Sequence, residues 1–305
     1  MKGLERNFAY YAGKADVRLN DNMHFLSEKS KFNLRTEAQA IARDLISIGY
    51  NRNGTAKNLT EQDIRSLVHA YQDKGLSVGT IQNKMTTVRH ILDSADNKIS
   101  ISNVQLGISE GRDVLNTANI NKACPLPDPE KLSAIKDKTL SAAILLAGAY
   151  GLRRDEALYI VHSLTLKHSV SENNKLIIPR GKGKGTVARS FEMRDGGNVL
   201  KTVAQAVSGL KTYNKIEKSR IEHFRNRLEN EVRKVDNLNM HGLRHAYAQE
   251  RYFSLTGGLL APTAGGLQYS AMSDVQKESY HAACQVISLE LGHTRETISR
   301  TYLGK

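Results

Sequence analysis

The chain has 305 residues, with 44 lysines and arginines against 31 aspartates and glutamates, which gives a formal net charge of +13 at pH 7. This length allows two modest domains of about 150 residues each, and the excess of positive charge makes nucleic acid the leading partner. The sequence lacks an 18-residue apolar run, an apolar signal segment after Met1 and more than two cysteines, so we expect a cytoplasmic, nucleoid-associated protein rather than a membrane or secreted one.

Weak periodicity in residues 1–30 predicts an N-terminal arm whose order the sequence leaves open. Residues 31–115 predict a small helical domain. Its three helices run from Thr36 to Gly49, from the N-cap at Thr60 to Gly75, and onward from Thr80. The third helix is expected to bury one set of residues, Ile81, Met85, Val88 and Leu92, and to expose another, Gln82, Lys84 and Arg89.

The stretch from Asn97 to Asp128 is rich in Asn, Ser, Gly and Pro and has the composition of a linker, and we place the domain boundary at 116–130. Residues 131–305 are expected to form the second domain. Leu140–Tyr150 is apolar on all sides and predicts a core helix that ends at Gly151.

A further helix is predicted from about Arg153 to Val161, and another over 215–235. Strands are predicted at Leu164–Leu166, Leu176–Ile178 and Val187–Phe191. The last two would form a hairpin around the glycine-rich segment 180–186. The expected fold class is therefore mainly α (α+β), with a small antiparallel sheet or hairpin in the second domain.

Single motifs in the second domain are weak evidence when taken alone. The segment Gly181-Lys182-Gly183-Lys184-Gly185 fits neither dinucleotide nor P-loop spacing. It is either a flexible hairpin tip or a means of bringing Lys182 or Lys184 to a phosphate. His241 and His245 are four residues apart but lack the glutamate of the metalloprotease motif, so we expect no metal site.

The motifs gain weight from their order along the chain. They are Gly151-Leu152-Arg153-Arg154-Asp155-Glu156, the hairpin lysine, His241-x-x-Arg244, Leu291-Gly292-His293 and Tyr302. This order, with eight residues between His293 and Tyr302, resembles the tyrosine recombinases, the phage-integrase and Xer family of site-specific DNA recombinases. The resemblance covers nearly the whole chain, because residues 80–92 look like the core-binding (SAM-like) domain of that family.

The resemblance implies cleavage and rejoining of DNA through a covalent 3′-phosphotyrosine, without a cofactor or metal. Tyr302 would be the nucleophile. A tyrosine phenol has a pKa of about 10, so it needs help to lose its proton. Arg153 and Arg244 would stabilise the negative charge that builds up on the phosphate oxygens.

The remaining site roles also follow from the resemblance. His241 would be the general base, and His293 would hydrogen-bond the scissile phosphate. Lys182 would protonate the leaving oxygen, with Lys184 as the alternative. Glu156 and His245 would brace the site without reacting.

Several basic residues outside this set are candidates for DNA contact, namely Lys84, Arg89, Lys184, Arg220 and Arg227. On the helix over 215–235, Arg220, Arg227 and Lys234 form a stripe that could equally be a solvated face. The interval between His241 and His293 is longer than simple members of the family need, so the resemblance implies an insertion at about 253–284. This insertion is either a tolerated loop or a device for target choice or subunit contact. Since the printed sequence ends three residues after Tyr302, subunit coupling is expected to differ from that of longer relatives or to use this insertion.

The expected partners are double-stranded attachment sites, further copies of the chain in a tetramer on synapsed DNA, and accessory DNA-bending or directionality factors, with no membrane. The expected task is integration or excision of a mobile element. Xer-type resolution of chromosome or plasmid dimers, a type IB topoisomerase and a non-catalytic DNA-binding relative are the alternatives.

Overall fold

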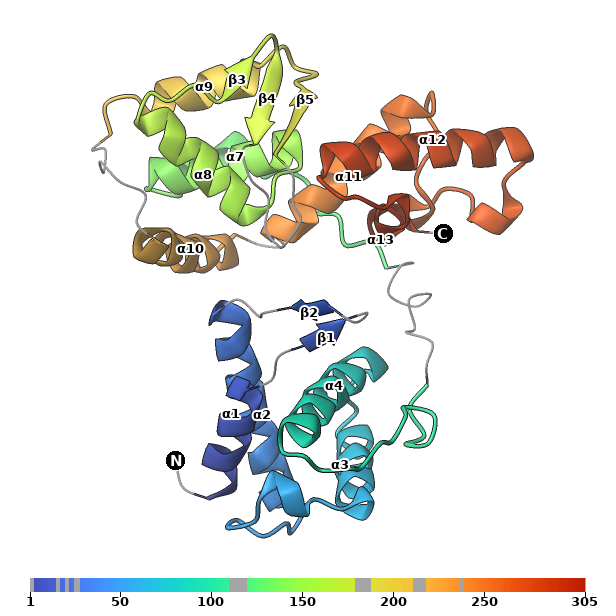
Figure 1. Cartoon of the computed structure of the whole chain (residues 1–305). Helices are drawn as coiled ribbons and strands as arrows, with labels where there is room; N and C mark the ends of the chain where they lie inside the picture. The colour runs from blue at the N-terminus through green and yellow to red at the C-terminus, as the bar shows by residue number, and fades with distance from the viewer. Residues whose placement is uncertain are drawn as a thin grey trace. The chain divides into compact units, whose positions relative to one another are not determined.

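The structure is a computed structural model that describes residues 3–14, 17–19, 22–24, 28–109, 120–178, 188–210, 218–235 and 238–304. The chain divides into two compact units, Met1–Val114 and Leu115–Lys305 (Figure 1). Each unit has its own hydrophobic core. No described helix is long and apolar enough to cross a membrane.

The first unit is a helical bundle with one short β-ribbon. Its elements are α1 Leu4–Lys14, β1 Val17–Leu19, β2 Asn22–His24, α2 Glu28–Ser47, the 3₁₀ turn η1 Ala56–Asn58, α3 Glu61–Asp73 and α4 Val78–Ser94. Strands β1 and β2 pair antiparallel. Helix α1 packs against α2 and α4 and buries Leu4, Phe8 and Ala12 completely. Part of the predicted N-terminal arm is therefore a core helix.

Local capping explains where α3 begins and confirms the N-cap that the sequence predicts at Thr60. The Thr60 hydroxyl accepts from the Asp63 backbone N–H, and the Asp63 carboxylate accepts from the Thr60 N–H, which is a complete capping box. Gly75 follows the helix in the left-handed region, at φ +68°.

Helix α4 buries Ile81, Met85, Val88 and Leu92 as predicted. The prediction that Gln82, Lys84 and Arg89 are exposed is wrong, because all three are only partly exposed and have partners within the unit. Gln82 Nε2 donates to Ser109 O at 2.7 Å.

The linker prediction also fails for its first part. Ile101, Leu106 and Ile108 are buried in the core of the first unit, and the Asn97 side-chain amide donates to three backbone carbonyls of residues 56–59. Further along, Cys124 is buried in the core of the second unit, and its N–H donates to Gly242 O at 3.0 Å. A polar composition is compatible with packed structure when several of the few apolar residues are buried, even though Val104 is exposed.

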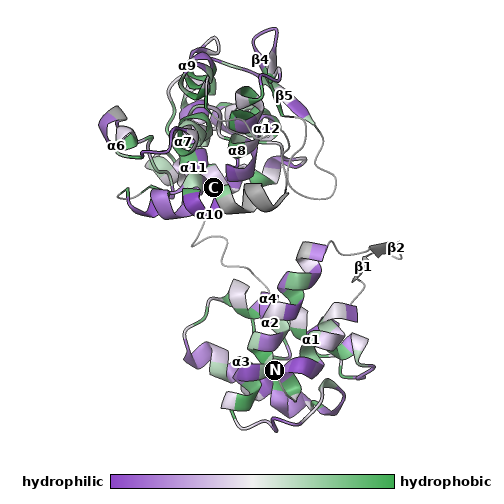
Figure 2. Cartoon of the chain, turned by 90° about the vertical axis from the view of Figure 1, so that its left-hand side faces the viewer, coloured by the Kyte–Doolittle hydropathy of each residue, from purple (hydrophilic) through white to green (hydrophobic). Residues whose placement is uncertain are grey.

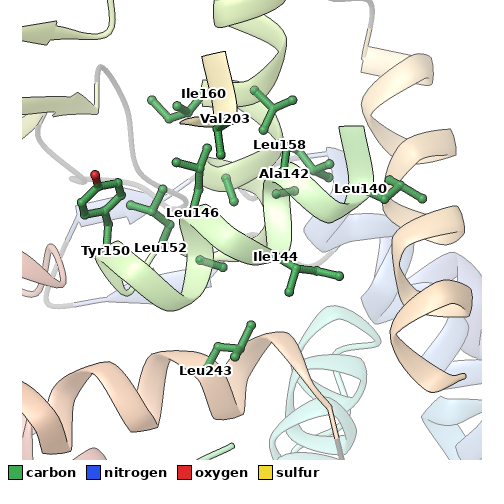
Figure 3. Close-up of a cluster of buried hydrophobic side chains, with 14 of the residues drawn as sticks. Leu140, Ala142, Ile144, Leu146, Tyr150, Leu152, Leu158, Ile160, Val203 and Leu243 are labelled. Carbon is green, nitrogen blue, oxygen red and sulfur yellow. The ribbon is translucent and has the colours of Figure 1, made fainter. Parts of the chain in front are cut away.

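The second unit is larger and contains the three-stranded sheet. Its elements are α6 Pro129–Ser133, α7 Lys138–Tyr150, α8 Arg154–Thr165, β3 Ser171–Glu172, β4 Lys175–Ile178, β5 Arg189–Glu192, α9 Asn198–Val207, α10 Lys218–Arg233, α11 Met240–Leu255, η2 Pro262–Ala264, η3 Tyr269–Ala271, α12 Asp274–Glu290, η4 Glu296–Ile298 and α13 Arg300–Leu303. As predicted, α7 is a core helix, and it packs against α8, α9 and α11. Figure 3 shows its apolar side chains meeting Leu158, Val203 and Leu243 from these neighbours.

The sheet order is β3-β4-β5, with both pairs antiparallel. Strands β4 and β5 overlap the two strands predicted for the hairpin, and Ile178 lies opposite Arg189. The strand predicted at Leu164–Leu166 is wrong, because α8 continues to Thr165. The mainly helical fold with a small antiparallel sheet agrees with the predicted class.

Helix α10 consists mostly of hydrophilic residues, as its colouring in Figure 2 shows.

A separate core joins α11, α12 and α13, and the predicted insertion at 253–284 contributes to it. Ala261, Met272, Tyr280 and Cys284 are buried there together with Tyr302 and Leu303. This segment is therefore packed structure in the second unit, and it supports the C-terminal helix directly.

Candidate active site

Arg244, in the second turn of α11, lies at the centre of the candidate site. Its side chain is 1% exposed, and its guanidinium donates to Gly151 O at 2.5 Å and to Leu291 O. Gly151 caps α7 at φ +60°, and a Cβ there would meet the Tyr247 ring at 2.5 Å. The motifs around residues 151, 244 and 291 are thus joined by one buried arginine.

Tyr302 lies in α13 with 4% of its surface exposed. Its hydroxyl accepts from Arg244 Nε at 3.1 Å and lies 3.3 Å from His293 Nε2. His293 Nε2 is also 3.2 Å from an Arg244 terminal nitrogen. Two of the three groups predicted to bind the phosphate, Arg244 and His293, therefore contact the predicted nucleophile.

Three histidine rings surround the Tyr302 ring, with centroids 5.8 Å away for His241, 4.7 Å for His245 and 5.9 Å for His293. Burial, together with Arg244, lowers the pKa of His293 to about 4, and burial followed by the nearby His241 lowers the pKa of His245 to about 4. Desolvation and Arg244 also lower the pKa of His241. A histidine that is neutral at pH 7 can accept the proton of a phenol.

His245 should make the protein sensitive to acid. Its folded pKa lies below the ordinary 6.5, so its contribution to stability is complete above pH 6.5 and is lost as the pH falls toward 4. We expect about 2–3 kcal/mol of this contribution to be lost between pH 7 and 4.5. Urea unfolding at the two pH values measures this loss. Between pH 7 and 4.5, the unfolding free energy of His245→Gln should fall by less than that of the wild type, whereas the fall in a variant with exposed His168 replaced by Gln should equal that of the wild type. An equal loss in His245→Gln and the wild type would contradict the assignment.

Arg153 directly precedes α8, and Glu156 fixes it. The Glu156 carboxylate accepts from Arg153 N at 2.9 Å and from one terminal guanidinium nitrogen at 3.0 Å. The Arg153 side chain remains 24% exposed and lines a cavity of about 560 Å³ together with His241 and Arg244. A phosphate that entered this cavity would therefore reach the guanidinium.

The structure thus gathers seven of the predicted residues in one place, namely Arg153, Glu156, His241, Arg244, His245, His293 and Tyr302. Lys182 and Lys184 lie outside the described residues, in the gap between β4 and β5. The side chain of Arg220 also lies outside the description. Among the described residues, no group of three or more His, Cys, Asp and Glu side chains is placed to hold a metal ion.

The predicted DNA contacts that can be described have partners within the protein. Lys84 pairs with Glu37 at 2.9 Å. Arg89 donates to Ile101 O and to Asn103 Oδ1, and Arg227 pairs with Asp137 at 2.6 Å while its side chain stays 47% exposed. Of these three, Arg227 is the one most accessible to a DNA backbone.

Sequence reasoning missed Thr263, in η2 of the predicted insertion. Its buried hydroxyl lies 3.2 Å from Tyr302 O and 3.0 Å from Leu303 O. The Gln249 side-chain amide, on α11, donates to the same hydroxyl at 3.1 Å and to Tyr302 O at 3.3 Å. Two residues outside the recognised motifs therefore anchor the backbone of the tyrosine helix, and no local pattern identifies either of them.

Thr263→Val should loosen the tyrosine helix with little change in side-chain volume. We expect a loss of about 1–2 kcal/mol in unfolding free energy. We also expect covalent capture of DNA, which is the formation of a covalent protein–DNA adduct, to be roughly tenfold slower at saturating protein, because a misplaced reacting group slows the reaction. Replacing exposed Thr202 with Val, on α9, is the control. Unchanged capture by Thr263→Val would show that the hydroxyl does not position Tyr302.

Two family models match the chain, "Phage integrase, N-terminal" over residues 19–101 and "Integrase" over residues 129–250. Among solved structures, the Tn1549 transposon integrase (residues 82–397) in complex with circular intermediate DNA aligns with 15% identity and a TM-score of 0.54, covering 100% of this chain and 96% of that one. A lambda integrase dimer bound to a core site aligns with 12% identity and a TM-score of 0.50, covering 99% and 95%. No curated protein matches the chain.

The helical first unit, the mixed second unit and the two integrase models together define a DNA strand transferase of the site-specific recombinase class. The chain belongs to the phage-integrase family of tyrosine recombinases.

Proposed function

We propose that this recombinase cuts and rejoins DNA through Tyr302, with Arg153 and Arg244 binding the scissile phosphate. The observation that carries the proposal is the contact of the Tyr302 hydroxyl with Arg244 and His293 in a site lined also by Arg153. Donors that are fixed in place before charge develops stabilise a transition state most strongly.

In the proposed reaction, phosphate oxygens take the place of the tyrosine hydroxyl beside Arg244 and His293. The freed hydroxyl passes its proton to His241 and attacks phosphorus. The bond from phosphorus to the 5′ oxygen breaks, and Lys182 protonates that oxygen. The resulting 3′-phosphotyrosine is resolved when a 5′ hydroxyl of another strand attacks it in the reverse step.

We also propose that residues 31–115 act as the core-binding domain and residues 131–305 as the catalytic domain. The substrates would be double-stranded attachment sites of a mobile element, bound by a homotetramer in the cytoplasm. The likeness to the Tn1549 and lambda integrases, whose structures contain DNA, supports integration or excision as the task.

Covalent capture tests this proposal. A duplex selected from a random pool by the protein itself is nicked near its centre, so that a cut fragment diffuses away and the adduct accumulates. Incubation in EDTA should give a protein–DNA adduct that resists SDS, and peptide mapping should find the attachment at Tyr302. No adduct on any nicked duplex, or attachment at another tyrosine, would overturn the proposal.

A further inference from the structure

Arg189, the first residue of β5, joins three parts of the second unit at the edge of the site. Its side chain is 10% exposed. Two terminal nitrogens donate to the Glu156 carboxylate, each at 2.9 Å, and Nε donates to Glu290 O at 3.0 Å. Strand β5, helix α8 and the end of α12 are thereby held by one guanidinium.

Gly292 shows how closely this arginine approaches the histidine turn. The glycine has φ +67°, and a Cβ on it would lie 2.7 Å from a terminal nitrogen of Arg189. The next residue, His293, contacts the Tyr302 hydroxyl. A side chain at position 292 would displace either the arginine or the turn that carries His293.

Glu156 is shared between two arginines. It is 4% exposed. Burial raises the pKa of the Glu156 carboxyl, but the hydrogen bonds and charge of Arg189, together with those of Arg153, outweigh burial and hold this pKa at about 2. Glu156 is therefore ionised at pH 7. Arg189 makes the two-pronged contact with it, and Arg153 uses one side-chain nitrogen and its backbone N–H.

The sharing of Glu156 between two arginines matters because a carboxylate and a phosphate compete for the same guanidinium fork. With Arg189 removed, the Glu156 carboxylate would lose its two-pronged partner. Arg153 is the other arginine in contact with it and would be drawn further toward it. The guanidinium edge that lines the cavity would then be engaged before any phosphate arrived.

We propose that Arg189 is a positioning residue for DNA cleavage, which occupies Glu156 so that Arg153 stays free for the scissile phosphate and which fixes the turn of His293. The inference rests on the function proposed above. Arg189 touches no reacting atom in this arrangement and acts through Glu156 and the Gly292 backbone. It also pairs with Ile178, next to the segment 179–187, which contains Lys182 and lies outside the described residues.

Charge-balanced variants separate this role from plain structural support. Arg189→Met should slow covalent capture at saturating protein by about 10–100-fold, with little change in the Kd for the nicked duplex. If the harm comes from an unoccupied Glu156 carboxylate, adding Glu156→Gln should recover about tenfold of that rate. Arg189→Lys keeps the positive charge without the planar fork, so its rate of covalent capture should lie between those of Arg189→Met and the wild type.

Arg225→Met is the matched control. Arg225 makes a two-pronged pair with Asp155 at 3.0 and 2.9 Å on the same helix α8, and its side chain is 16% exposed. It comes from α10 and, among the described residues, forms its ion pair with Asp155 and not with Glu156. Its loss should lower stability but leave capture at saturation unchanged.

The Nε–H NMR signal of Arg153 gives a readout that needs no DNA. This signal should shift in Arg189→Met as Glu156 engages Arg153, and it should return toward the wild-type position in the double variant. Absence of an adduct in the wild type would overturn the proposed function, while the NMR comparison would still decide the role of Arg189. An unshifted signal, or a double variant that captures DNA no faster than Arg189→Met, would overturn the positioning role.

Discussion

Tyr302→Phe is expected to abolish covalent capture of DNA while leaving both units folded and able to bind it. The substitution removes only the hydroxyl, and no other atom of the ring can attack phosphorus. The loss leaves Arg244 Nε without its acceptor in a buried position, which should cost about 1–3 kcal/mol of unfolding free energy. Adduct formation on nicked duplexes and chemical unfolding measure the two effects separately.

Tyr252→Phe and Tyr280→Phe are the matched controls for this result. Both residues are buried in the core that also holds Tyr302. The Tyr252 hydroxyl is buried with no hydrogen-bond partner among the described residues, whereas Tyr280 donates to Gly304 O at 2.6 Å. Both variants should still capture DNA. If Tyr302→Phe still formed the adduct, or if Tyr252→Phe lost it, the assignment of Tyr302 as the nucleophile would be wrong.

The sequence was most informative where chemistry depends on residue type and spacing. The motifs that carry the candidate site span 150 positions, from Arg153 to Tyr302, yet the structure brings them together. Arg244 and His293 contact the Tyr302 hydroxyl, and Arg153 lines a cavity with His241 and Arg244. Helix α7 was predictable for a different reason, because a segment that is apolar on every side can only be a core element.

What the sequence could not predict depends on long-range contacts. Arg189 reaches a carbonyl 101 positions away, and Thr263 reaches one 40 positions away, so neither has a local signature. The false strand at Leu164–Leu166 has another cause, since a short apolar run is compatible with both strand and helix. Helix α1 was not predicted because only three of its residues, Leu4, Phe8 and Ala12, are fully buried in the core of the first unit.

These long-range contacts change the meaning of the insertion at 253–284. Thr263 binds the backbone of the tyrosine helix, and Ser299, at the start of α13, donates to Cys284 O at 3.1 Å. Within the described chain, the tyrosine helix is therefore held by its own subunit. The position of Tyr302 therefore depends on contacts that the 253–284 segment makes with the helix that carries it.

Arg244→Lys is the second change with a very large expected effect. An ammonium cannot reproduce the planar fork that serves Gly151 O, Leu291 O and the Tyr302 hydroxyl together. We expect capture to fall by about 10²–10³ at saturating protein, the loss typical of removing one fixed donor from an anionic transition state. Each buried carbonyl left without a donor should cost about 1–3 kcal/mol of unfolding free energy.

The kinetic loss in Arg244→Lys must be separated from the structural one, because the same side chain serves both. Arg225→Lys makes the same chemical change in a two-pronged pair away from the tyrosine, so it should lose stability and keep its capture rate. Measuring Arg244→Lys well below its unfolding midpoint, at DNA concentrations that saturate binding, then isolates the chemical step. If capture there matches the wild type, the planar fork of Arg244 supports the fold and is not needed to stabilise the phosphate in the transition state.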